Sequence, residues 1–197
     1  MSRLKKGDSG ARAELIMTLR RHSFVFLIND SDTHNLEDSI AVVSSYMECI
    51  KPGISLRHGI DILKHKEKLH VHLQKTRSGW LTEADVIATG GECPSTAEFL
   101  SSINSTWAQM EEVGLLCLDV LCPSIGMGGA TELVTKYCDP SPLPDGALSS
   151  SCFDVFLYFN THQSATNCPS HYDPGFFTLI KDNGVPGLEV CAHRFSI

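Results

Sequence analysis

The stretch that decides the fold reads CFDVFLYFN at Cys152–Asn160 and, after a polar loop, NCPSHYDPGFFTLIKDNGVPGLEV at Asn167–Val190. Within Phe153–Phe159 apolar side chains recur at every second position, which predicts a β-strand with one buried face. Two further strands are predicted at Phe176–Ile180 and Gly187–Cys191, because Asp-Asn-Gly between them is a turn signal. The end of the chain is therefore predicted to be all β.

The chain before this stretch is predicted to be mainly helical. Apolar residues at helical spacing predict helices at Ala11–His22, with Ser9 as its N-cap, and at Leu36–Ile50. The longest predicted helix, Ser95–Leu121, opens with the capping box Ser-Thr-Ala-Glu. A short apolar strand is predicted at Ser23–Ile28.

The segment Ile54–Thr89 mixes Lys and His and has no clear period, so it is predicted to be solvated surface or a mobile loop. His70 and His72, near His65, suggest a metal site. We disfavour that interpretation because no Asp or Cys accompanies them at ligand spacing and the neighbouring Lys side chains would repel a cation.

The predicted fold class is α+β. A helical region at residues 1–150 precedes a β-rich region at 151–197, and a β core behind a helical layer is the expected architecture. A length of 197 residues suits one globular domain.

Composition excludes several functions. A net charge of −7 argues against an extended phosphate-binding surface, so no nucleic-acid partner is expected. No apolar run is long enough to cross a bilayer, and the N-terminus lacks the apolar segment of a signal peptide, so no membrane partner is expected. The eight Cys form no C-x-x-C pair, which favours reduced thiols and a cytoplasmic location.

The triplet His171-Tyr172-Asp173 is the most specific indication of a functional site in the sequence. On extended backbone, an imidazole and a carboxylate two residues apart point to the same side. They supply two of the three ligands in the 2-His-1-carboxylate triad that holds non-haem Fe(II). Chance places roughly one such triplet in every two chains of this composition, so the flanking strands and turn carry the argument.

The segment Asn167–Val190 resembles the isopenicillin-N-synthase-like Fe(II)/2-oxoglutarate-dependent dioxygenases. The likeness lies in HYDPGFFTLI followed by a turn and VPGLEV; it is looser over Phe153–Asn160 and only architectural over the helices. It implies a partial double-stranded β-helix (jelly roll) over 151–197, with His171 and Asp173 as iron ligands. Fe(II), 2-oxoglutarate, molecular oxygen and a small organic substrate are the implied cofactor, cosubstrates and substrate.

The resemblance also implies a tyrosine that binds 2-oxoglutarate, and Tyr158 is the nearest candidate. A register slip of one residue would move that side chain to the other face of its strand. His193 is the candidate third iron ligand, and Arg194 opens an R-x-S like the one that binds the 2-oxoglutarate carboxylate in the family. The alternative interpretation of His193 and Arg194 is an exposed tail.

The family's later strands, with their distal His, have no counterpart before Ile197, so a truncated product is expected. Whether the chain is an enzyme stays open. Half a jelly roll leaves unpaired strand edges, which predicts low stability or a protein partner that completes the sheet. Two alternatives remain: a non-catalytic fragment that binds a partner, and a cupin-like metal-dependent hydrolase or isomerase.

Overall fold

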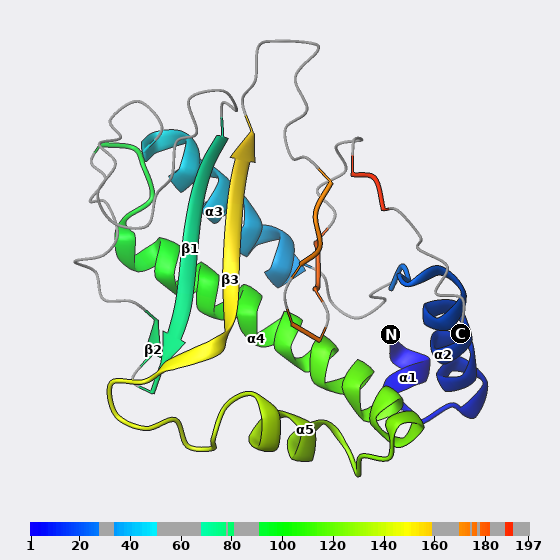
Figure 1. Cartoon of the computed structure of the whole chain (residues 1–197). Helices are drawn as coiled ribbons and strands as arrows, with labels where there is room; N and C mark the ends of the chain where they lie inside the picture. Colours follow the sequence, from blue (N-terminus) through cyan, green and yellow to red (C-terminus); the bar gives the residue numbers. More distant parts are fainter. Residues whose placement is uncertain are drawn as a thin grey trace. The chain divides into compact units, whose positions relative to one another are not determined.

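The computed structural model describes residues 1–27, 34–50, 68–77, 79–80, 91–158, 170–173, 175–176, 178–181 and 188–190. Its helices and strands follow one another along the chain (Figure 1). They are α1 Ser2–Lys5, α2 Ser9–His22, α3 His34–Ile50, β1 Lys68–Thr76, β2 Gly79–Trp80, α4 Thr96–Leu121, the 3-10 helix η3 Cys122–Ile125, α5 Ala130–Tyr137 and β3 Leu148–Tyr158.

The chain divides into two compact units. Unit 1 comprises Met1–Thr33, Met110–Leu133 and Asp173–Ile197, and unit 2 comprises His34–Gln109 and Val134–Tyr172. Each unit has its own apolar cluster among the described residues. The predicted boundary at residue 150 stays a prediction.

Unit 1 is organised around α2 and the later turns of α4. Leu4, Leu15 and Val120 belong to its buried cluster. The N-cap of α2 is Asp8, whose carboxylate accepts a hydrogen bond from Ala11 N at 2.9 Å. The prediction of Ser9 as the cap was wrong by one residue, because a carboxylate in the preceding position can also accept from the first turn.

The strand predicted at Ser23–Ile28 is wrong over its described part. Ser23 ends α2 in the left-handed conformation, and the residues after it up to Leu27 are irregular. Val25 and Leu27 pack against the unit 1 cluster, while Phe26 is exposed. The described residues of this apolar segment therefore pack on the helices of unit 1 and do not pair as a strand.

Unit 2 contains a three-stranded antiparallel sheet in the order β2-β1-β3. The two long strands, β1 and β3, pair from Lys68 opposite Tyr158 to Thr76 opposite Leu148, with an irregularity between Gln74 and Thr76. We call this pair the ribbon. The prediction of a surface or mobile loop at Ile54–Thr89 was wrong where β1 lies, because this strand is defined by a partner far along the chain.

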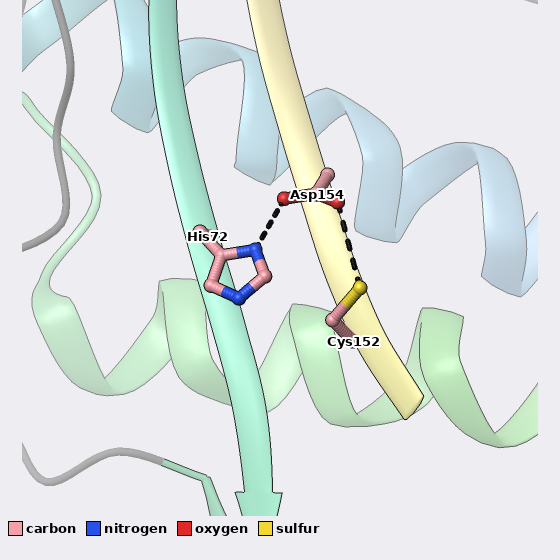
Figure 2. Close-up of side chains that lie close together, drawn as sticks. All are labelled: His72, Cys152 and Asp154. Atoms are coloured by element: carbon pink, nitrogen blue, oxygen red, sulfur yellow. Dashed lines mark hydrogen bonds and ion pairs between the residues drawn. The ribbon is translucent and has the colours of Figure 1, made fainter. Parts of the chain in front are cut away.

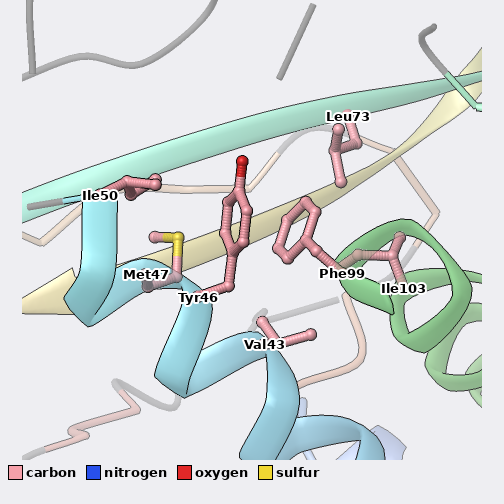
Figure 3. Packing of buried hydrophobic residues seen from close by; sticks show 7 residues of the cluster. All are labelled: Val43, Tyr46, Met47, Ile50, Leu73, Phe99 and Ile103. Atoms are coloured by element: carbon pink, nitrogen blue, oxygen red, sulfur yellow. The ribbon is translucent and has the colours of Figure 1, made fainter. Parts of the chain in front are cut away.

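One face of the ribbon is covered by α3 and the first turns of α4 (Figure 1). Phe153, Val155 and Leu157 of β3 pack against the buried cluster of unit 2, which confirms the predicted strand and its buried face. At the centre of the cluster Tyr46 and Phe99 stack with ring centroids 4.1 Å apart (Figure 3). The cluster consists of Val43, Tyr46, Met47, Ile50, Leu73, Phe99 and Ile103.

Helices α3 and α4 confirm the helices predicted at Leu36–Ile50 and Ser95–Leu121. At the start of α4, Ser95 N and Ser95 Oγ both donate to Glu98 Oε2 at 2.8 Å, and Glu98 N donates to Ser95 Oγ at 3.2 Å. This is the predicted capping box. These hydrogen bonds, the backbone one first, lower the pKa of Glu98. Pro123 lies in η3, where the α-helix has ended, as predicted.

The α+β class is confirmed in its coarse form, as a majority of helix with one small antiparallel sheet. The described residues contain no jelly roll. The strands predicted at Phe176–Ile180 and Gly187–Cys191 are irregular wherever the structure describes them. Most of their apolar side chains are exposed there, including Phe176 and Leu188. In the described part of the chain these segments therefore pair with no strand of the sheet.

Cys49 and Cys93 form a disulfide, with their Cα atoms 6.0 Å apart. The prediction that all eight thiols are reduced is therefore wrong for this pair. Residues 44 positions apart carry no spacing signal, and the fold of unit 2 brings them together. Among the described cysteines, those that form no disulfide are Cys117, Cys122, Cys138 and Cys152.

Among the described helices, no single one is long and apolar enough to cross a bilayer. Only the helices spanning Thr96–Ile125 and Ala130–Tyr137, counted together across a bend, reach that length and composition.

Asp139 anchors the start of β3. Its carboxylate accepts hydrogen bonds from the buried Ser149 hydroxyl and, at 2.7 Å, from Ser150 N. Burial opposes ionisation of Asp139, but these hydrogen bonds outweigh it and lower its pKa below the ordinary 3.8. The ionised form is therefore the one that the folded state favours.

We expect Asp139→Asn to lower the free energy of unfolding at neutral pH, because the amide accepts more weakly than the carboxylate. Since the folded pKa is depressed, the wild-type advantage is full above the ordinary pKa of 3.8 and declines as the pH falls below it through the folded pKa. Urea unfolding of both proteins from pH 7 down to pH 3 measures this advantage. A difference that is constant with pH would contradict the assignment.

Candidate functional site

The triplet His171-Tyr172-Asp173 is exposed and outside regular structure. Tyr172 is 79% exposed, so the segment is open to a ligand from solvent. His171 falls in unit 2 and Asp173 in unit 1, and each is described within its own unit. His193 and Arg194 lie outside the described residues. The pairing of His171 with Asp173 at a metal stays a prediction.

Tyr158 ends β3 on the side away from the helices. Phe153, Val155 and Leu157 turn toward the buried cluster, so the intervening residues form the opposite face of the strand. We call that opposite side of the ribbon the outer face. Phe156 and Tyr158 stack there, with ring centroids 6.0 Å apart and the rings inclined by 15°. Tyr158 is therefore placed on the face that a ligand can reach.

Three polar side chains, His72, Cys152 and Asp154, form a group on the same outer face (Figure 2). His72 of β1 stands directly opposite Asp154 of β3 in the antiparallel register. His72 Nδ1 lies 2.7 Å from Asp154 Oδ1, and Cys152 Sγ lies 3.6 Å from Asp154 Oδ2. One ligand atom from each of the three residues lies within 4.8 Å of the others.

The local sequence did not reveal this group. A metal role for His72 was disfavoured because no Asp or Cys lies near it in sequence. Strand pairing nevertheless brings Asp154 of β3, 82 residues away, beside His72, together with Cys152 of the same strand. The signal that could have found it is the C-x-D spacing of Cys152 and Asp154 inside a predicted strand, since residues i and i+2 share a face. Identifying His72 as their partner required the register of the ribbon.

No family model, curated protein or solved structure matches this chain. The chemistry of the His171-Tyr172-Asp173 triplet and of the group formed by His72, Cys152 and Asp154 therefore has to be argued from these residues themselves.

Proposed function

We propose that this chain is a non-haem Fe(II)/2-oxoglutarate-dependent dioxygenase of the isopenicillin-N-synthase-like kind, which oxidises a small organic substrate. The observation that carries the proposal is the His171-Tyr172-Asp173 triplet within its HYDPGFFTLI and VPGLEV setting. Both donors are exposed, and neither is held inside a helix, which suits ligands that must reach one ion.

The donor chemistry fits the implied iron. An imidazole nitrogen from His171 and a carboxylate oxygen from Asp173 are two members of the facial triad. His193 is the candidate for the third. With 2-oxoglutarate bound, the iron supplies oxygen activation, and the protein supplies binding and orientation.

Tyr158 is proposed to bind 2-oxoglutarate. Its hydroxyl can donate a hydrogen bond to a carboxylate, and its position on the outer face leaves the ring accessible. In the proposed jelly roll, the ribbon forms part of one sheet. The outer face then lines the interior of the β-helix, and α3 and α4 cover the outside. This arrangement accounts for aromatic side chains on the face that carries no helix.

The test measures conversion of 2-oxoglutarate to succinate with added Fe(II). We expect His171→Ala and Asp173→Ala to lose at least about 100-fold in turnover, because each removes one of the proposed protein ligands of the iron. His22→Ala, which removes an exposed imidazole from α2, is the matched control and should leave turnover unchanged. Tyr158→Phe should raise the KM for 2-oxoglutarate several-fold with little change in kcat.

Equal turnover by the wild-type protein and His171→Ala would remove the metal assignment. Absence of turnover in the wild-type protein would contradict the enzymatic proposal and favour a non-catalytic, partner-binding role. Metal-dependent chemistry that does not require 2-oxoglutarate would favour the cupin-like alternative.

A further inference from the structure

We propose that His72, Cys152 and Asp154 form a zinc site on the outer face of the ribbon, separate from the His171–Asp173 pair. The three residues supply one imidazole nitrogen, one thiol sulfur and one carboxylate oxygen within 4.8 Å of one another. These are the three ligand types that Zn²⁺ takes in proteins.

The distances suit a single small ion. In a tetrahedral zinc site, Zn–N of about 2.0–2.1 Å and Zn–S of about 2.3 Å place the ligand atoms roughly 3.3–3.8 Å apart. The sulfur lies 3.6 Å from one oxygen of Asp154, within that range, and the imidazole lies 2.7 Å from the other oxygen. Small side-chain rotations that open the His72–Asp154 hydrogen bond would admit the ion.

The backbone holds the three residues in place. His72 and Asp154 are direct partners in the antiparallel register, and Cys152 precedes Asp154 by two residues on the same face. The opposite face of β3 is packed against the buried cluster through Phe153 and Val155. The Cα positions are therefore set by sheet pairing and core packing, which reduces the conformational entropy lost on binding.

The charges balance as well. Neutral imidazole, thiolate and carboxylate together carry −2, which one Zn²⁺ neutralises. In the metal-free protein the thiol lies beside the carboxylate, so binding exchanges the thiol proton for the metal and releases that proton to solvent. Three protein ligands leave a fourth position for water, the arrangement of an open zinc site rather than a closed structural one.

Cobalt substitution tests the site in the full chain. We expect Co²⁺ bound at this site to give a near-ultraviolet thiolate-to-cobalt absorption band that Cys152→Ser abolishes. His72→Ala and Asp154→Asn should each weaken Co²⁺ affinity at least about tenfold, since even a group that only supports a ligand contributes 10–100-fold. His171→Ala should leave the band and its affinity unchanged, which distinguishes this site from the iron site.

A measurement on the unmutated chain makes the test independent of how the variants fold. We expect Zn²⁺ to slow alkylation of Cys152 by iodoacetamide at least about tenfold, as followed by peptide mass mapping. Cys138, which also forms no disulfide and is less exposed than Cys152, is the internal control and should react at the same rate with and without zinc. Equal rates at Cys152 with and without Zn²⁺, or a cobalt band that persists in Cys152→Ser, would overturn the proposal.

Discussion

Replacing Phe99 by alanine is expected to lower the free energy of unfolding of unit 2 by about 3–5 kcal/mol. Phe99 is fully buried, and its ring stacks on Tyr46 with centroids 4.1 Å apart. The substitution removes apolar contacts and leaves a cavity between α3, α4 and β1, since Leu73 of β1 belongs to the same cluster. Urea unfolding followed by circular dichroism gives the free energy.

Phe156→Ala is the matched control, because it deletes the same side chain from the other face of the ribbon. Phe156 is 43% exposed and stacks on the partly exposed Tyr158. A loss of less than about 1.5 kcal/mol is expected, in line with an aromatic pair near solvent. Equal losses from the two substitutions would show that the cluster around Phe99 is not the core of unit 2.

Reducing the Cys49–Cys93 disulfide is expected to cost about 4 kcal/mol of stability. The bond closes a loop of 44 residues, and the chain entropy that such a loop removes from the unfolded state corresponds to roughly this value. The disulfide joins α3 to the residues just before α4, the two helices that pack on the ribbon. The midpoint of urea unfolding should therefore fall when a phosphine reductant is added.

A Cys49→Ser/Cys93→Ser variant supplies the control for that experiment. It should unfold at the midpoint of the reduced wild-type protein and show no further change with the reductant, because the remaining thiols form no disulfide in the described structure. If the urea midpoint of the wild-type protein is the same with and without the reductant, the disulfide does not contribute to stability.

The sequence predicts the elements whose signals are local. The 3.6-residue apolar period of α3 and α4, the Ser95–Glu98 capping box and the alternation of β3 are each contained within a few turns or one strand. These signals reflect burial of one face, and the buried cluster uses those faces.

The elements that sequence reasoning missed depend on distant partners. Strand β1 is a strand because it pairs with β3, and the Lys and His residues that suggested a loop are compatible with a strand. The disulfide and the grouping of His72 with Asp154 arise the same way, from chain segments 44 and 82 residues apart. Periodicity within a window cannot report such pairings.

The order of the ribbon's strands has a consequence for how the protein is made. During synthesis β1 leaves the ribosome well before β3, and α4 and α5 are translated between them. The helices form from local contacts, whereas β1 can make its hydrogen bonds with β3 only after residues 148–158 have been synthesised. We therefore expect nascent chains that end before Leu148 to expose an unpaired strand edge, the feature that chaperones bind and that seeds aggregation.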